Sequence, residues 1–364
     1  MINLVKNIIK ENSNDFTSDD AILFITMEDP IQKLVRRFIS IFGNIDASMV
    51  KLLYQKSYES LKANQLYSEI DNNLINKVTS LFQGVLNASI AKQTKGKVNL
   101  IVKYASEGTF SAGDVSKFID RLKIEGYNTK MVILDYLDCM APIVSKNQKS
   151  GDYDIQGQIT QELRYLAAQY KVPIITATQN TRGSDNVNVA LSNNMAGDSY
   201  KKIRYSDFVY MCRQDSTKDP FDPAVRQFVI DDEYKIGKDQ LSPDILRLKD
   251  QICSDVIPLE VKITKSKDGG KDQSRYLLFC KKNLRIYNTI GEYIRDMKPL
   301  LNSSKKLEGD IGKLSAFAVS SVSFNPDEQM DMLLDQVVQI DPPIDPDTVF
   351  QEAPNFDIPA FLSH

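Results

Sequence analysis

Three polar side chains follow three apolar runs, at the point where a buried strand would end. These side chains are Glu28, Asp135 and Gln179. The runs before them are Ala21–Met27 (AILFITM), Met131–Leu134 (MVIL) and Val172–Ala177 (VPIITA). A carboxylate after four apolar residues can hold Mg²⁺ through water, since magnesium prefers oxygen ligands and keeps several waters. A second carboxylate nearby can polarise an attacking water, and an amide can donate a hydrogen bond to a phosphate oxygen.

Each of these three residues also has an ordinary structural explanation. Glu28 can be a helix N-terminal acid before Pro30, and Gln179 a turn amide. Many buried strands end in aspartate, as this one does at Asp135. The combination at three successive strand ends is more specific than any one member, because the carboxyl ends of strands in an open parallel sheet form its usual site.

Histidine and cysteine usage removes several other chemistries. The only histidine is His364, the last residue, which argues against a histidine base or a histidine-bound metal. The four cysteines stand far apart without a C-x-x-C pair. This spacing argues against a zinc site or a disulfide framework and favours a reducing, cytoplasmic compartment. No apolar stretch approaches the ~20 residues of a membrane span.

The elements that must position the site alternate between strand and helix. Helical patterns occupy Pro30–Phe42, Asp114–Glu125 and Gln156–Tyr170, and Asp114 is expected as an N-cap. The three apolar runs are continuous rather than alternating, which is typical of strands covered on both faces. The sequence therefore predicts an α/β fold with an open, mostly parallel sheet flanked by helices.

The C-terminal half predicts a different arrangement. A strand is expected at Phe208–Met211, followed by a polar insertion over 214–256. Strands Pro258–Thr264 and Arg275–Cys280 should form an antiparallel hairpin around the turn Lys267–Lys271. The predicted division is a core at 1–290, a linker or peripheral segment at 291–323 and a flexible tail at 324–364.

Charge separates the tail from the body. From Ser315 onward there are nine acidic residues and no lysine or arginine, whereas the whole chain has a net charge of −3. The body is therefore net positive, which is compatible with nucleic-acid binding but equally with an ordinary surface. Six of the fourteen prolines lie from Phe324 onward, which is typical of a segment without its own core.

Four motifs in order carry a family resemblance. They are FITMED, VILDYLDCM, LRYLAAQYKVPIITATQNTRG and YSDFVYMCRQD. Together they resemble the RecA-like motor domain of DnaB-type replicative DNA helicases, most of all those of the T-even phage kind, over residues 1–290. The resemblance implies an ATP- and Mg²⁺-dependent motor that forms a ring, expected to be a hexamer, on single-stranded DNA.

The resemblance also implies individual roles. Glu28 matches the catalytic glutamate, Asp135 the Walker B aspartate that holds Mg²⁺ through water, and Gln179 the sensor of the γ-phosphate. Arg182 begins the loop behind that sensor. Lys265 and Lys267 match a Lys-x-Arg pair that reaches the nucleotide of a neighbouring subunit. Lys267 departs from the pattern, because lysine lacks the bidentate fork of arginine, and the pair can equally be a solvated turn.

Two loops are expected to face DNA in the ring. One spans Ala141–Gln158 and the other Arg182–Arg204. Positive side chains there would track phosphates, although exposed loops are polar in any protein. The candidate DNA-binding residues are Lys146, Lys149, Lys201, Lys202 and Arg204.

The phosphate-binding motif G-x-x-x-x-G-K-[ST] does not occur in the sequence. Residues Ile2–Glu11 resemble the remainder of the helix that such a loop opens. One expectation is that the loop is encoded on a separate upstream segment. The other is that the chain is a degenerate relative that has lost nucleotide binding. The joint presence of Glu28, Asp135 and Gln179 favours the first.

The resemblance implies that the chain is the C-terminal part of a replicative helicase motor, which unwinds duplex DNA at the fork. The expected location is the cytoplasm, or the cytoplasm of the host cell if the chain is encoded by a bacteriophage. The alternatives are a non-catalytic RecA-like adaptor and a recombinase-like DNA-binding protein. Expected partners are single-stranded DNA, further copies of the chain and the segment with the phosphate-binding loop. A primase, helicase loader or single-strand-binding protein would bind the acidic tail.

Overall fold

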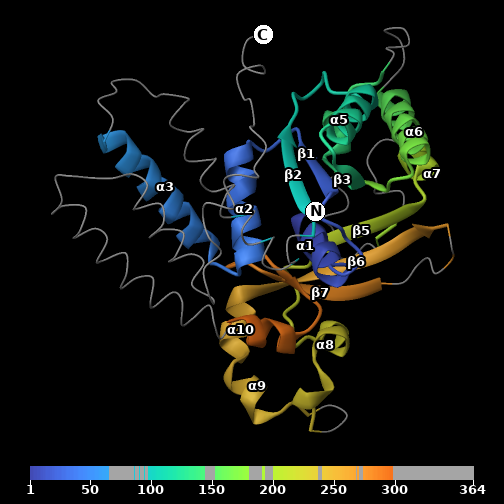
Figure 1. Cartoon of the computed structure of the whole chain (residues 1–364). Coiled ribbons are helices and arrows are strands. Elements are labelled where there is room, and N and C mark those ends of the chain that lie inside the picture. The colour runs from blue at the N-terminus through green and yellow to red at the C-terminus, as the bar shows by residue number, and fades with distance from the viewer. Residues whose placement is uncertain are drawn as a thin grey trace.

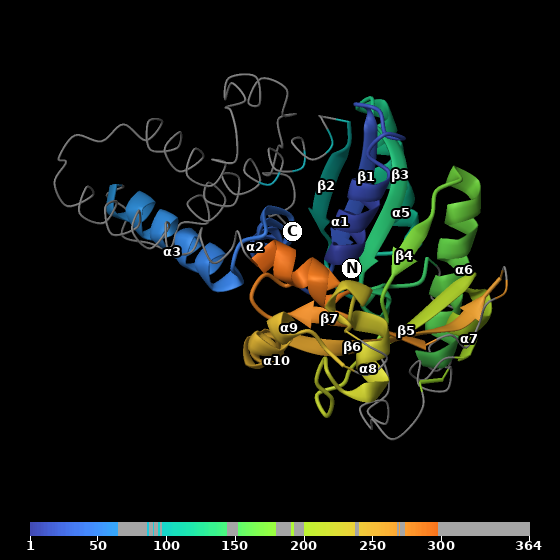
Figure 2. The same ribbon diagram turned by 90° about the horizontal axis from the view of Figure 1, so that it is seen from below.

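The computed structural model describes most of the chain up to residue 297. The described residues are 1–64, 86, 90, 94, 97–143, 152–179, 191–192, 200–236, 240–267, 269 and 274–297. They form two four-stranded sheets with helices packed around them (Figures 1 and 2). Within these residues no helix is both long and apolar enough to cross a membrane.

The first sheet is parallel throughout. Its strands are β1 (Asp20–Thr26), β2 (Asn99–Tyr104), β3 (Asn128–Asp135) and β4 (Ile174–Thr176), in the spatial order β2-β1-β3-β4. The helices along this part of the chain are α1 (Ile2–Glu11), α2 (Ile31–Gly43), α3 (Ala47–Asn64), α5 (Ala112–Ile124) and α6 (Asp152–Tyr170). The predicted α/β class with a parallel sheet is confirmed.

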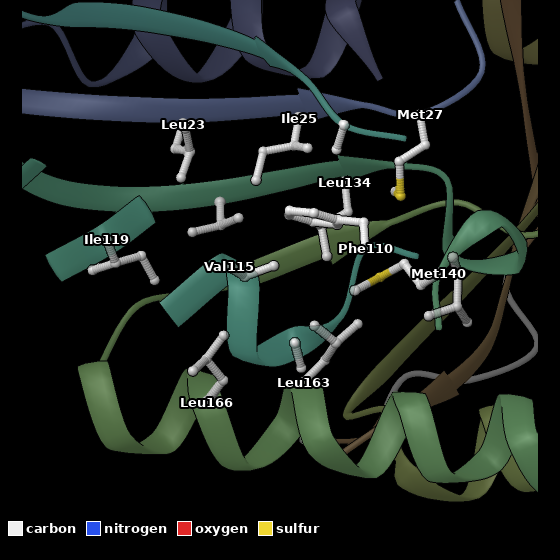
Figure 3. Packing of buried hydrophobic residues seen from close by; sticks show 14 of the residues in the cluster. Leu23, Ile25, Met27, Phe110, Val115, Ile119, Leu134, Met140, Leu163 and Leu166 are labelled. Carbon is white, nitrogen blue, oxygen red and sulfur yellow. The ribbon is translucent and has the colours of Figure 1, made fainter. Parts of the chain in front are cut away.

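Both faces of the first sheet are covered, as the continuous apolar runs predicted. Leu23 and Ile25 of β1 point to one core together with residues of α5 and α6, and Figure 3 shows Val115 and Leu166 on that side. Ile22 and Phe24 point to the opposite core with α1 and α2. Because neighbouring residues of a strand face opposite ways, an apolar run must be buried on both sides.

Two local expectations are corrected. Ser111, not Asp114, is the N-cap of α5, and Asp114 stands at the third helical position in a capping box with it. The Asp114 carboxylate accepts from the Ser111 main-chain N–H at 3.0 Å. Asp114 thus pairs with a main-chain N–H group at the start of the helix while itself lying in the first helical turn. Strand β2 was not anticipated, because its run Leu100–Val102 is short and lies beside lysines.

The second sheet is antiparallel, with the order β5-β6-β7-β8. Its strands are β5 (Phe208–Gln214), β6 (Val256–Ser266), β7 (Ser274–Cys280) and β8 (Ile286–Tyr287). The hairpin expected around residues 267–271 is present as the β6–β7 pair. Near this sheet lie the helices α7 (Tyr200–Tyr205), α8 (Pro223–Val229), α9 (Pro243–Arg247) and α10 (Lys249–Asp255).

The stretch 214–256 supplies a large part of the second core. Val225, Val229, Ile245 and Ile252 are all buried there, against β7 and the helix at 290–297. That last helix contributes Ile290, Tyr293 and Met297, so the packed structure continues past residue 290. The acidic tail 324–364 lies outside the described residues.

Candidate functional site

The ends of β1, β3 and β4 meet at one edge of the first sheet. Because the three strands are parallel, Thr26 pairs with Asp135 and Leu134 pairs with Thr176. The Met27 N–H also donates to the Asp135 main-chain carbonyl at 2.8 Å. The structure therefore brings together the segments that carry Glu28, Asp135 and Gln179.

A turn after β1 fixes the position of Glu28. The Thr26 hydroxyl donates to the Asp29 carbonyl at 3.1 Å and accepts from the Asp29 N–H at 3.3 Å. The Asp29 side chain is held by Lys33 at 2.5 Å and by Arg37, both from α2. Asp29 is buried, whereas Glu28 is exposed at the sheet edge. The turn therefore leaves the Glu28 carboxylate in solvent, where it can meet a substrate.

Negative charge accumulates around Asp135. Burial raises the pKa of its carboxyl, the carboxylates of Asp29 and Glu28 raise it further, and the Met1 amino group and Arg37 oppose the shift. The shift indicates that these groups lie close enough to Asp135 to interact electrostatically with its carboxylate. A cation placed beside Asp135 would relieve this repulsion.

The Asp135 carboxylate has the chemistry to bind Mg²⁺ through water. Within the part of the chain that the structure describes, no three side chains of His, Cys, Asp or Glu converge on one ion position. Mg²⁺ keeps several waters and needs one or two protein carboxylates, so Asp135 can hold it without a further protein ligand.

A second anchored turn follows β4. The Asp138 carboxylate accepts from the Thr178 hydroxyl at 2.7 Å and from the Gln179 N–H at 3.1 Å. Lys202 of α7 completes this group, because its ammonium pairs with Asp138 and also donates to the Thr178 hydroxyl at 2.8 Å. These contacts tie the end of β4 to the segment after β3 and to α7.

Tyr136 contacts the second turn, and sequence reasoning missed it. The Gln179 side-chain amide donates to the Tyr136 hydroxyl at 3.0 Å. Burial raises the pKa of Tyr136 to about 12, with smaller contributions from Cys139 and from the charges of Glu28 and Asp138. The residue thus stays a neutral phenol at pH 7. Its position directly after Asp135 was the feature of the sequence that could have indicated Tyr136 as a site residue.

The placement of Lys202 corrects one expectation. Its side chain was expected on an exposed DNA-facing loop, yet Lys202 lies in a helix and is only 6% exposed. An ammonium buried to this degree needs an anionic partner, and Asp138 supplies it. The expectation of an exposed Lys202 is therefore wrong.

The other proposed DNA-binding cations fall into two groups. Lys201 and Arg204 are exposed on α7. Lys201 packs so closely over α6 that a Cβ on Gly157 would meet the Lys201 Cβ at 2.6 Å. Lys146 and Lys149 lie outside the described residues, as does Arg182, which was expected at the nucleotide site.

Lys265 and Lys267 make contacts within this chain. The Lys265 ammonium donates to the main-chain carbonyls of Ile203 and Arg204 at 2.6 and 2.9 Å, at the end of α7. Lys267 is exposed and lies 3.6 Å from the Asp207 carboxylate. Among the contacts of the described residues, none joins either lysine to Glu28 or Asp135. Lys265 thus caps α7, where a cation is favoured.

Comparison with known proteins gives the family. The model of the DnaB-like helicase C-terminal domain matches residues 1–190, slightly more than half of the chain and the part that carries the sheet edge described above. The chain belongs to the DnaB-like helicase C-terminal domain family. This membership supports a replicative helicase motor in general terms and confirms the resemblance at family level.

Solved structures add similarity of low identity. A DnaB-like replicative helicase, described with its interactions with primase, is 15% identical, with a TM-score of 0.47 over 79% of this chain. A second solved structure, described as an ATPase domain, is 17% identical, also with a TM-score of 0.47 over 79% of this chain and 80% of its own. The chain spans 55% of the length of the first of these. No curated protein matches the sequence.

Proposed function

We propose that the chain is the motor part of a replicative helicase, which hydrolyses ATP at the edge formed by β1, β3 and β4. The observation that carries the proposal is the convergence there of the segments with Glu28, Asp135 and Gln179, where Gln179 donates to Tyr136, the residue after Asp135. In this proposal hydrolysis drives a ring of subunits along single-stranded DNA and separates the duplex at a fork, as for a phage-encoded helicase.

Each residue of the site has a distinct proposed task. The exposed Glu28 carboxylate orients and polarises the attacking water. Asp135 holds the Mg²⁺ that accompanies the nucleotide, which would neutralise phosphate charge when bound. In this proposal Gln179 exchanges the Tyr136 hydroxyl for an oxygen of the γ-phosphate as its hydrogen-bond acceptor. That exchange of hydrogen-bond acceptor would report whether the γ-phosphate is present.

The phosphate-binding loop is proposed to come from a further segment, since the sequence lacks G-x-x-x-x-G-K-[ST]. Main-chain N–H groups and the lysine of such a loop normally cradle the phosphates. The purified chain should therefore bind ATP weakly by itself. Binding at micromolar concentration would contradict this part of the proposal.

Proposed DNA contacts come from Lys201 and Arg204 on α7, together with Lys146 and Lys149, whereas Arg182 is proposed to act at the nucleotide site behind Gln179. Because Lys202 is paired with Asp138, it holds α7 in place in this proposal and does not bind phosphate. The tail 324–364 is proposed to bind a primase, a loader or a single-strand-binding protein. Its apolar side chains lie among acids and can dock in a groove without a core of their own.

The test is a glutamate-to-glutamine exchange in the motor reconstituted with its phosphate-loop segment. Glu28→Gln should lower hydrolysis by about 10²–10⁴-fold while nucleotide binding stays unchanged, because the base is lost but the binding groups remain. The matched control is Glu11→Gln at the exposed end of α1. Near-normal turnover by Glu28→Gln would show that another residue activates the water.

A shared active site in the ring is proposed for Lys267, which could reach a neighbouring subunit by leaving Asp207. Subunits with Lys267→Ala and subunits with Glu28→Gln should each be inactive. Mixed rings should regain some turnover, since some interfaces then pair an intact Glu28 with an intact Lys267. Full activity of Lys267→Ala, or mixed rings that never recover, would place the trans-acting group elsewhere.

A non-catalytic RecA-like adaptor is the competing function, because the sequence lacks the phosphate-binding motif on which hydrolysis depends. A recombinase-like DNA-binding protein is the other competitor. Reconstitution with the phosphate-loop segment separates them from the motor. An adaptor would assemble without DNA-stimulated hydrolysis, and a recombinase would pair homologous strands without unwinding a fork.

A further inference from the structure

The segment that follows β2 lies against the segment that follows β3. The Gly108 N–H donates to the Cys139 carbonyl, and the Ala141 N–H donates to the Phe110 carbonyl, both at 2.8 Å. Phe110 packs in the same core as Met27, the residue directly after β1 (Figure 3). These hydrogen bonds therefore join the chain beyond β2 to the chain beyond β3 across the end of β1, which lies between the two strands in the sheet.

A tight turn after β2 places Glu107 at this junction. The Thr109 hydroxyl donates to the Ser106 carbonyl at 3.3 Å. Gly108 has a φ of 73°, a backbone conformation that residues with a side chain rarely adopt. The turn leaves Glu107 exposed, whereas Cys139, which the next residue contacts through its main chain, is only 3% exposed. An exposed carboxylate therefore lies beside a buried thiol.

The Cys139 thiol lies between Glu107 and Tyr136. It hydrogen-bonds to the Tyr136 hydroxyl and to the Glu107 carboxylate. The Cys139 N–H also donates to the Tyr136 carbonyl at 3.2 Å, so the main chain holds these two residues together independently of the thiol. Burial raises the pKa of the Cys139 thiol, Tyr136 opposes this shift, and Glu107 raises the pKa further. The group therefore remains a thiol at pH 7, which can donate one hydrogen bond and accept another.

A single assignment of donors satisfies these contacts. The Gln179 side-chain N–H donates to the Tyr136 oxygen at 3.0 Å. Because a carboxylate can only accept, the Cys139 S–H must donate to Glu107. The sulfur is then left to accept from the Tyr136 O–H. The result is a continuous line of hydrogen bonds from Gln179 to Glu107, in which every donor points toward the carboxylate.

We propose that Glu107 is a positioning residue of the candidate site, which acts through Cys139 and Tyr136 to hold the Gln179 amide on the Tyr136 hydroxyl. Hydrogen bonds that point the same way polarise one another, so a hydroxyl that donates becomes a better acceptor. The negative charge of Glu107 at the end of the line therefore makes the Tyr136 oxygen a stronger acceptor for Gln179.

The consequence for turnover rests on the proposed function, whereas the line of hydrogen bonds does not. In the proposed motor the γ-phosphate competes with the Tyr136 hydroxyl for the Gln179 amide. A ligand binds more weakly when part of its binding-competent state is withdrawn into another arrangement. Glu107 thus sets how readily Gln179 leaves Tyr136, although it does not touch the nucleotide in this proposal.

Two spectroscopic signals of the full chain without nucleotide test the two ends of the line. The infrared S–H stretch of Cys139 is isolated by difference from matching chains that carry Cys139→Ala. It should move to higher frequency in Glu107→Ala, because the thiol loses its acceptor. The side-chain amide NMR signal of Gln179, assigned by its absence in Gln179→Glu, should also move in Glu107→Ala. Its shift should be toward the position found in Tyr136→Phe, which removes the acceptor of Gln179 altogether.

Conservative variants separate a hydrogen-bonding role from a structural one. Glu107→Gln keeps an acceptor without the charge and should restore both signals in part. Cys139→Ala should shift the Gln179 signal, whereas Cys139→Ser keeps a donor and an acceptor and should leave it near its original position. Glu11→Ala, at the exposed end of α1, is the matched control and should change neither signal. Circular dichroism and urea unfolding establish that each variant is folded.

Several outcomes would overturn the proposal. Unchanged S–H and Gln179 signals in Glu107→Ala would leave Glu107 as a surface acid. A Gln179 shift in Cys139→Ala without one in Glu107→Ala would end the line at the thiol. In the reconstituted motor, Glu107→Ala should lower the KM for ATP by about twofold at constant kcat, because one weak hydrogen bond is affected. A higher KM would contradict the competition for Gln179. Because the spectra need no nucleotide, failure of the hydrolysis proposal would leave them unchanged.

Discussion

The turns after β1 and after β4 are both held by an aspartate paired with basic residues, but these basic residues lie at different distances along the chain. Each anchors an aspartate with basic residues and leaves the proposed functional side chain exposed, Glu28 in one turn and Gln179 in the other. Asp29 takes both its cations from α2, four and eight residues further along the chain. Asp138 takes its cation from Lys202, 64 residues away.

This difference determines whether a movement of each turn can affect other elements of the fold. The Asp29 turn is closed within one strand–helix unit, so its geometry depends on little else. The Asp138 turn holds α7, and Lys265 of β6 caps the other end of that helix. A movement of Gln179 would therefore reach α7, with the exposed Lys201 and Arg204, and the second sheet. The first turn fixes the exposed Glu28, and the second connects the exposed Gln179 to distant elements.

After Glu28→Gln, the largest effect among changes to the two turns is expected from Gln179→Ala. Gln179→Ala in the reconstituted motor should lower ATP turnover by about 10²-fold, because the proposed donor to the γ-phosphate is lost. The free energy of unfolding should change little, since Gln179 is exposed. Steady-state turnover and urea unfolding give both numbers. Gln169→Ala on the exposed surface of α6 is the control, and equal turnover by the two variants would remove the sensor role.

The ion pair of the second turn should carry the largest effect on stability. Lys202→Met leaves Asp138 without its cation, and we expect a loss of about 2–3 kcal/mol in the free energy of unfolding. Lys201→Met on the same helix changes an exposed lysine and should cost far less. Adding Asp138→Asn to Lys202→Met should recover part of the loss. Equal urea midpoints for the two lysine variants would show that the pair contributes nothing.

The corresponding change in the first turn should be smaller and sensitive to salt. Arg37→Met removes one of the two cations on Asp29, and the Arg37 side chain is 40% exposed. We expect a loss of about 1 kcal/mol or less, which shrinks further in high salt as the pair is screened. Unfolding at two salt concentrations measures this. A salt-independent loss as large as that of Lys202→Met would erase the contrast between the turns.

The smallest effect concerns Asp135 and has the opposite sign. Burial and two neighbouring carboxylates raise the pKa of Asp135 in the folded chain. The folded state therefore favours the protonated carboxyl, and this group's contribution to stability declines as pH rises from the unfolded pKa through the folded one. Asp135→Asn should flatten that decline and stabilise the chain slightly at pH 7, by less than about 1 kcal/mol.

Thermal unfolding of both forms between pH 4 and pH 8, in steps of about one unit, checks the Asp135 prediction. The same variant should disturb the magnesium dependence of the reconstituted motor, because the proposed cation ligand is gone. A less stable Asp135→Asn at pH 7 would mean that the carboxylate is satisfied in the folded chain.

The sequence by itself determined the parallel sheet and the three residues at its edge. Runs such as Ala21–Met27 are apolar at nearly every position, and a strand buried on both faces explains that composition. Parallel strands then place Asp135 and the segment of Glu28 at one edge, whatever the details of packing. The hairpin around residues 267–271 was also predictable from local sequence, because turn residues separate two apolar runs.

Only the tertiary structure decided which polar residues are partners and which face solvent. Lys202 and Lys201 are adjacent lysines with the same local composition, yet the first is buried against Asp138 and the second is exposed. Their side chains point in different directions around α7, and this matters only because α7 packs on α6 at Gly157. The division into two sheets was likewise beyond sequence patterns, because strand order depends on contacts between residues far apart in the chain.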